Sequence, residues 1–107
     1  LAYIGSSPTF VDDDKASNFP TEIVLFQNYP NPFNPSTNIG FQISNLVFVS
    51  LRIYDVLGRE LVMLVKEEKQ PGVYEVQFDA SNLSSGIYYY KLVSGRFIET
   101  KKMIFLK

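Results

Sequence analysis

The chain has 107 residues and a formal net charge of −1, and 46% of its residues are hydrophobic and 15% aromatic. This is the size and composition of one globular domain, without the basic excess typical of nucleic-acid-binding proteins. Cysteine and histidine are both absent, which excludes disulfide bonds, thiolate metal sites, and catalysis by a cysteine nucleophile or a histidine base.

Residues 1–22 differ in composition from the rest of the chain. Serine, aspartate, proline and glycine dominate 5–22 without a steady period, which predicts a linker or the tail of a preceding domain. Asp12, Asp13 and Asp14 suggest calcium, but EF-hand spacing is missing, so a solvated acidic run is the better interpretation and calcium binding stays open. The chain begins at Leu1 without a signal peptide, and we interpret it as a piece of a longer protein.

From residue 23 onward, β-like runs alternate with turn signals, which predicts one domain over 23–107. Ile39, Phe41 and Ile43 fall on one face of a run with period 2, as in a strand that packs on a core. No window has a helical period, so we expect an all-β sandwich of seven strands. These strands are expected at 22–29, 37–43, 47–55, 60–66, 72–79, 86–93 and 96–107.

The stretch NYPNPFNPST at 28–37 is a rigid entry to this domain rather than a strand or a helix. Pro30, Pro32 and Pro35 have a fixed φ and no backbone N–H. We expect its asparagines to bond to nearby backbone and its aromatic rings to hold the segment on the sandwich. These residues are Asn28, Asn31, Asn34, Tyr29 and Phe33.

Several turns follow from local chemistry. Gly58 in VLGR and Gly95 in VSGR predict tight hairpins that need a positive φ. The Pro71–Gly72 pair predicts a turn before a strand. SNLSSGIY at 81–88 resembles a tyrosine corner, in which the hydroxyl of Tyr88 bonds to backbone a few residues upstream.

The search for catalytic groups finds little. The serines have no base to activate them. Asp55, Glu75 and Asp79 suggest a carboxylate pair for acid–base chemistry on sugars, but the two aspartates sit beside turns and Glu75 faces outward. No phosphate loop and no apolar run of 18 residues is present. We therefore predict a non-enzymatic domain with no cofactor, no metal, no nucleic-acid partner and no transmembrane segment.

Two surface features remain open. Phe48, Tyr54 and Tyr89 fall on outward strand faces. Either their rings form a flat platform that binds carbohydrate, or the rings are covered by other segments or scattered over the surface. The covered or scattered arrangement is favoured. Lys101 and Lys102 lie in the terminal strand and Lys107 ends the chain. These lysines either protect an edge strand from aggregation or mark it for a protein partner, which would recognise the strand by strand addition or by charge. Self-association of the domain through its edge strands is also open.

The sequence resembles one family over residues 23–107. The matching runs, in order, are LFQNYPNPFNPSTNIGFQI (25–43), VSLRIYDVLGREL (49–61), PGVYEVQFDASNLSSGIYYYKL (71–92) and KKMIFLK (101–107). They are similar to the type A C-terminal sorting domain of the type IX secretion system, found at the end of secreted proteins of Bacteroidetes and related bacteria.

This resemblance implies an immunoglobulin-like sandwich that serves as an address for export. Cargo would cross the periplasm, the outer-membrane translocon would recognise the domain, and a surface sortase would remove it, with its cut somewhere in 1–22. The cargo would end at the cell surface or outside. The resemblance favours recognition over protection for the lysines, and its candidate contacts are Gly86, Tyr88, Lys101, Lys102 and Lys107. Its structural motif residues are Asn28, Pro30, Asn31, Pro32, Phe33, Pro35, Pro71, Gly72 and Tyr74. The alternative is a carbohydrate-binding or structural accessory module of a secreted enzyme.

Overall fold

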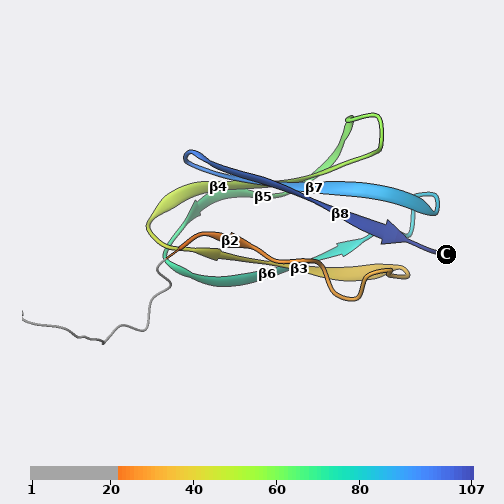
Figure 1. Cartoon of the computed structure of the whole chain (residues 1–107), viewed down its shortest axis with the longest axis horizontal. Helices are drawn as coiled ribbons and strands as arrows, with labels where there is room; N and C mark the ends of the chain where they lie inside the picture. The colour runs from red at the N-terminus through yellow and green to blue at the C-terminus, as the bar shows by residue number, and fades with distance from the viewer. Residues whose placement is uncertain (1–21) are drawn as a thin grey trace, which may run out of the picture.

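The computed structural model describes residues 22–107, which fold into seven antiparallel strands in two stacked sheets (Figure 1). One sheet has the order β2-β3-β6 and the other has the order β5-β4-β7-β8. The strands are β2 (Val24–Leu25), β3 (Ser36–Ile43), β4 (Val47–Tyr54), β5 (Glu60–Lys69), β6 (Gly72–Asp79), β7 (Gly86–Ser94) and β8 (Phe97–Phe105). The prediction of an all-β sandwich is confirmed, and the immunoglobulin-like assignment stays a prediction.

The core lies between the two sheets and follows the period-2 pattern of the sequence. Ile39, Phe41 and Ile43 of β3 are buried, and they face the buried alternate residues of β4 and β7 in the other sheet. β3 pairs with β6 along its whole length, from Ser36↔Asp79 to Ile43↔Gly72. Because side chains alternate across a strand, this register places the apolar face of each strand inward.

The first strand is shorter than the sequence predicts. β2 has two residues, Val24 and Leu25, which pair with Gln42 and Phe41 of β3. The Phe26 N–H still donates to the Gly40 carbonyl (3.0 Å), and a last contact with β3 follows at the Tyr29↔Asn38 bridge, at the start of the proline-rich stretch. Proline lacks the N–H that a ladder requires, so regular pairing ends there.

The proline segment, which we define as residues 28–35, crosses from one sheet to the other. Its second contact is a parallel bridge between Phe33 and Phe105 at the end of β8. The Phe33 ring is 2% exposed and stacks on the Phe105 ring with centroids 5.2 Å apart. Phe33 therefore holds the segment on the core, as predicted. Tyr29 does not: it is 79% exposed, and the prediction that it packs against the sandwich is wrong.

A buried polar contact anchors the chain just before the prolines. The Tyr90 hydroxyl accepts a hydrogen bond from the Asn28 N–H (2.8 Å) and donates one to the Phe26 carbonyl (2.7 Å). The Asn28 side chain donates to the Pro30 carbonyl and to Thr37 Oγ1. The local bond predicted for Asn28 is confirmed, whereas sequence alone gave no sign of its link to Tyr90.

The tight hairpins appear where glycine predicted them. Gly58 (φ 83°) turns the chain between β4 and β5, and Gly95 (φ 62°) turns it between β7 and β8. These two turns lie at opposite ends of the sandwich (Figure 1). β2 begins at the Gly95 end, and β8 runs to the Gly58 end, where the C-terminus lies.

Candidate recognition site at the C-terminal strand

β8 forms one edge of the four-stranded sheet, with β7 as its neighbour on one side. Met103 and Phe105 point inward and are fully buried. They make the strand part of the core, so it is not a detachable tail. The intervening Lys102 is exposed on the outer face, in register with Tyr89 of β7.

The free edge of β8 is partly covered by the proline segment. The Ile104 N–H donates to Asn31 Oδ1 (2.9 Å), and the Ile104 carbonyl accepts from the Phe33 N–H (3.0 Å). Gln27 Nε2 donates to the Lys102 carbonyl (2.8 Å). Asn31 was expected to bond to nearby backbone, so its partner 73 positions away corrects that prediction.

A shorter stretch of this edge stays open. Backbone groups alternate between the two sides of a strand, and those of Lys102 and Ile104 point away from β7. The groups of Ile98 and Thr100 therefore point the same way, before the stretch that the proline segment covers. Ile98 is 65% exposed. Pairing with a strand of a partner, if it takes place on β8, would use this stretch.

The three candidate lysines lie in different surroundings. Lys101 Nζ lies 3.4 Å from Glu99 Oε2, and only 28% of its side chain is exposed. Lys102 and Lys107 are exposed, and among the described residues neither has a carboxylate within ion-pair distance. The structure therefore makes Lys102 and Lys107 the more accessible cations of this strand and its tail.

Backbone bonds fix the residues after β8. The Leu106 N–H donates to the Phe33 carbonyl (3.1 Å), and the Lys107 N–H donates to Ser85 Oγ (2.8 Å). Ser85 directly precedes Gly86, so the tail lies beside the start of β7. The structure thus brings Gly86, the proline segment and the C-terminal tail to one end of the molecule (Figure 1).

The predicted tyrosine corner is confirmed. The Tyr88 hydroxyl donates to the Ser84 carbonyl, four residues upstream, at 2.6 Å, and the side chain is 8% exposed. Little of Tyr88 is therefore available to a partner. Its role as a contact stays a prediction, while its contribution to the turn is a direct observation.

A second tyrosine corner lies at the beginning of β6. The Tyr74 hydroxyl donates to the Gln70 carbonyl, again four residues upstream, at 2.6 Å. Its ring stacks on Phe41 with centroids 5.5 Å apart. Gly72 and Gly86 stand two residues before these tyrosines, with φ of 159° and 157°. The PGVY motif is thus a turn and core element, as its sequence predicted.

Comparison with known proteins supplies the family. A family model described as "Secretion system C-terminal sorting domain" matches residues 27–106. The match begins beside the proline segment and ends within the C-terminal tail, so it spans the fold just described. The chain belongs to this family. No curated protein matches it.

Membership gives the sorting domain its general role. It is a C-terminal signal of the type IX secretion system, which directs an attached cargo across the outer membrane to the cell surface or outside. Among the described residues, no helix is long and apolar enough to cross a membrane.

Two aspartates of the sorting domain hold its turns. Asp55 accepts hydrogen bonds from the Arg59 N–H, from Arg59 Nε and from the Leu57 N–H, and these bonds hold its pKa below the usual range. The Asp79 carboxylate accepts from the Ser81 hydroxyl and N–H, which lowers its pKa as well. Within residues 22–107, no three acidic side chains gather as a metal site would require.

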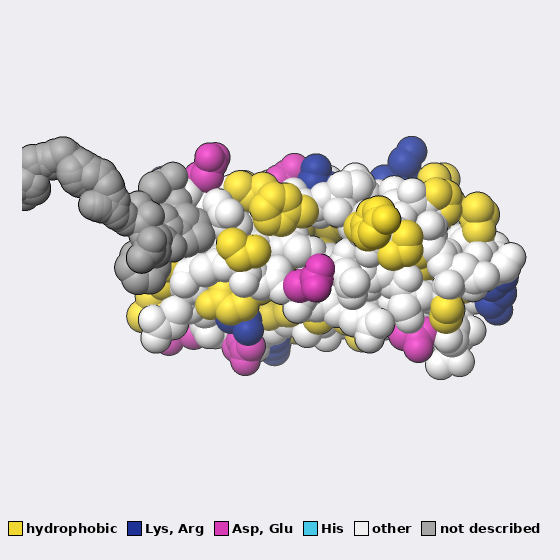
Figure 2. Space-filling model, turned by 90° about the horizontal axis from the view of Figure 1, so that it is seen from below, with side chains coloured by type: hydrophobic (Ala, Val, Ile, Leu, Met, Phe, Trp, Pro, Cys, Tyr) yellow, Lys and Arg dark blue, Asp and Glu magenta, His cyan; other side chains and the backbone are white. Residues whose placement is uncertain are grey.

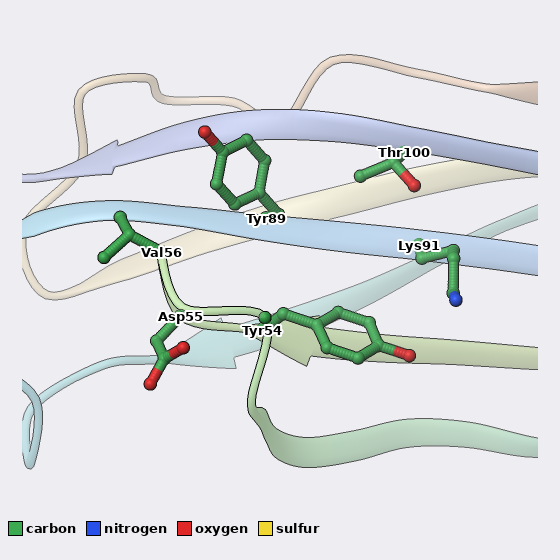
Figure 3. Close-up of a pocket in the computed structure, with 7 residues that line it drawn as sticks. Tyr54, Asp55, Val56, Tyr89, Lys91 and Thr100 are labelled. Carbon is green, nitrogen blue, oxygen red and sulfur yellow. The ribbon is translucent and has the colours of Figure 1, made fainter.

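The outward aromatics do not form one patch. Tyr54 and Tyr89 are register partners on β4 and β7 and line a common hollow (Figure 3). Phe48 is 53% exposed and lies near the other end of β4, in register with Glu68. A platform of all three rings is therefore absent from the described surface, and a smaller site with two tyrosines remains.

The described basic residues belong to only one of the two sheets and its flanking segments, whereas acidic residues lie on both. β2, β3 and β6 contain Glu75 and Asp79 and no lysine or arginine. Every described basic residue lies on β4, β5, β7, β8, their connecting turns or the C-terminal tail. Viewed from the side of the three-stranded sheet, basic side chains appear only toward the margins (Figure 2).

Proposed function

We propose that the translocon recognises the end of the sandwich where the C-terminal tail lies, with Lys102 and Lys107 as the principal charged contacts. The observation that carries this proposal is the fixed geometry of the tail. The Leu106 and Lys107 N–H groups are held by Phe33 and Ser85, so the tail keeps one position. A preformed charged surface binds without the entropy cost of ordering a loose peptide.

The position of this end also suits export. The cargo is attached on the N-terminal side, and β2 begins at the end opposite the C-terminal tail. The proposed recognition surface is therefore remote from the cargo, and cargoes of different shape leave it exposed. In the same proposal, residues 1–22 form the linker to the cargo, 23–107 form the sorting domain, and the cargo passes through the periplasm.

We further propose that a surface sortase removes the domain by a cut within residues 1–22. Those residues lie outside the part of the chain that the structure describes, apart from Glu22. The support for this step is the family membership and the composition of the segment. The expected product is a cargo that carries part of 1–22 at its C-terminus, which mass spectrometry of the exported protein identifies.

The test is export of a reporter fused to residues 23–107 in a host that has a type IX system. We expect the intact fusion in the medium or on the cell surface. The double variant Lys102→Ala/Lys107→Ala should reduce export at least about tenfold, because it removes both charges that the proposal assigns to the contact with the translocon. A reporter that stays periplasmic with the intact domain contradicts the sorting role itself.

A matched control separates recognition from folding. Lys66 is exposed on β5 of the same sheet, and Lys66→Ala should be exported normally. Purified domains with either change should unfold at the same urea concentration, since exposed lysines contribute little to stability. Normal export of the double lysine variant would overturn the assigned contacts while leaving the sorting function intact. Deleting 101–107 is no substitute, because it removes the buried Met103 and Phe105.

A further inference from the structure

The outer face of the four-stranded sheet carries a hollow that the sorting role does not use. It has a volume of about 480 Å³ and lies over β4, β7 and β8 (Figure 3). Pockets of 300–1,000 Å³ are the usual size for small ligands. The lining residues are Tyr54, Asp55, Val56, Gly58, Tyr89, Lys91 and Thr100.

The sheet register brings its polar and aromatic groups together. Tyr89 and Lys91 are two residues apart on β7, so both project from the outer face. Tyr89 pairs with Tyr54 on one side and with Lys102 on the other, and Lys91 pairs with Thr100. Lys102 does not line the hollow, so the groups that share it are two aromatic rings, one ammonium group and a hydroxyl.

One tyrosine holds the cation and leaves the other ring for a ligand. Lys91 Nζ lies over the Tyr54 ring, 5.2 Å from its centroid, in a cation–π contact. The Tyr89 side chain is half-buried and lies beside the hollow (Figure 3). The Tyr89 ring extends toward β8, where Thr100 lies, and the Lys91 ammonium turns toward β4 and Tyr54, so the two groups border different sides of the hollow (Figure 3).

Within residues 22–107, the hollow is lined by a single cation, Lys91. Asp55 is its single carboxylate, and that group is bound by Arg59 Nε at 2.8 Å and by two backbone N–H groups. Among the described residues, neither Lys91 nor Lys102 has a carboxylate within ion-pair distance. An anionic ligand in the hollow would therefore meet the Lys91 ammonium, which no described carboxylate neutralises.

From these observations we propose that the hollow binds a carboxylated saccharide, that is, a uronic acid unit of an acidic glycan. The Tyr89 ring stacks on the C–H face of the sugar, the Lys91 ammonium binds the carboxylate, and the Thr100 hydroxyl bonds to a ring hydroxyl. A wholly apolar ligand would leave Lys91 and Thr100 without partners. A neutral sugar would gain nothing from the Lys91 ammonium.

The test titrates the purified full chain with trigalacturonate and measures binding by NMR and calorimetry. The methyl ester of trigalacturonate is the control ligand, because it keeps the sugar rings and removes the charge. We expect binding of trigalacturonate that weakens as salt is raised, and binding of the ester at least about tenfold weaker, a difference of about 1.4 kcal/mol. Shifts should concentrate on Tyr89, Lys91 and Thr100.

Substitutions in the hollow have matched controls on the same sheet. Tyr89→Ala and Lys91→Gln should each weaken binding about tenfold, which corresponds to about 1.4 kcal/mol. Phe48→Ala removes an exposed aromatic ring at the other end of β4, and Lys66→Gln removes an exposed lysine on β5. Both controls should bind as the parent chain does, and an NMR spectrum of each variant with the parent's dispersion shows that the sandwich is folded during the titration.

Three outcomes would overturn the proposal. The first is no titration at millimolar trigalacturonate. The second is equal affinity for the methyl ester, which removes the role of Lys91. The third is binding of hexaglutamate in the same hollow without binding of trigalacturonate, which would make this face a docking surface for an acidic polypeptide. Each is independent of the export assay, so the two proposals fail separately.

Discussion

At the scale of single residues, Tyr90 joins β7 to the chain that precedes the proline segment. Its side chain is fully buried, and its hydroxyl satisfies both the Asn28 N–H and the Phe26 carbonyl. Removing one partner of a buried hydrogen bond leaves the other groups unsatisfied, which costs about 1–3 kcal/mol. We expect Tyr90→Phe to lower the free energy of unfolding by that amount in urea denaturation. Tyr89→Phe is the control and should change it by less than about 0.5 kcal/mol.

The same phenol predicts a pH dependence. Burial raises the pKa of Tyr90 from 10.0 to about 12. A group whose folded pKa is raised gives a stability that is fully present below pH 10 and is lost as the pH rises through 12, because the unfolded chain ionises first. Unfolding measured from pH 9 to 12 should show stability falling across this window. Tyr90→Phe should show a smaller fall, since other tyrosines and lysines account for the remainder; an equal fall in both proteins would contradict this assignment.

At the scale of elements, the proline segment covers part of the β8 edge. Asn31 Oδ1 accepts from the Ile104 N–H, while no side-chain hydrogen bond is found for Asn34 among the described residues. These two asparagines differ by three positions in one motif, so they make a matched pair. In hydrogen exchange, Asn31→Ala should speed exchange of the Ile104 amide, and Asn34→Ala should not. Equal protection of Ile104 in both variants would show that Asn31 does not hold this edge.

The two tyrosine corners begin strands in opposite sheets, so they permit a second comparison of elements. Each hydroxyl donates to the carbonyl four residues upstream, at Gln70 for Tyr74 and at Ser84 for Tyr88. A typical hydrogen bond contributes about 0.5–1.5 kcal/mol. Tyr74→Phe and Tyr88→Phe should each lower stability within that range, and their effects should add, because the corners lie at opposite ends of the sandwich. Markedly non-additive unfolding energies would contradict independent corners.

The sequence predicts those features that depend on local pattern. Period-2 alternation placed Ile39, Phe41 and Ile43 in the core, and the SNLSSGIY stretch predicted the corner at Tyr88. Prediction from the sequence failed for residues whose contact partners are distant along the chain. Nothing near Asn31 indicates that its partner is Ile104, and nothing near Tyr29 shows that its ring would find no pocket. Such contacts depend on how the sheets stack, which no short window encodes.

In the candidate recognition site and in the hollow, too, the sequence indicated the residue types but not their contacts. The sequence indicated the terminal lysines, but only the fold separates the ion-paired Lys101 from the exposed Lys102 and Lys107. It also indicated Tyr54 and Tyr89 as outward aromatics. Their register across β4 and β7, and the position of Lys91 over Tyr54, depend on strand pairing that the sequence does not specify.

At the scale of the whole molecule, the sandwich has two functionally different ends. β2 begins at the end of the Gly95 turn, whereas the Gly58 turn, Gly86 and the C-terminal tail share the other end (Figure 1). If recognition takes place at the tail, an obstruction at that end should block export and one at the opposite end should not. Two exposed hairpins of one sheet make this test possible.

A small folded domain inserted after Leu57 should reduce export of a reporter fusion at least about tenfold, and the same insertion after Gly95 should leave export near that of the parent. Both positions lie in exposed hairpin turns, where insertions are usually tolerated by the fold. The distance between the two ends, rather than a loss of stability, is the reason for the difference. Each purified domain should unfold at the same urea concentration, and the exported fraction is measured in medium, surface and periplasm. If the insertion after Gly95 blocked export and the insertion after Leu57 did not, recognition would lie at the end of the sandwich nearest the cargo.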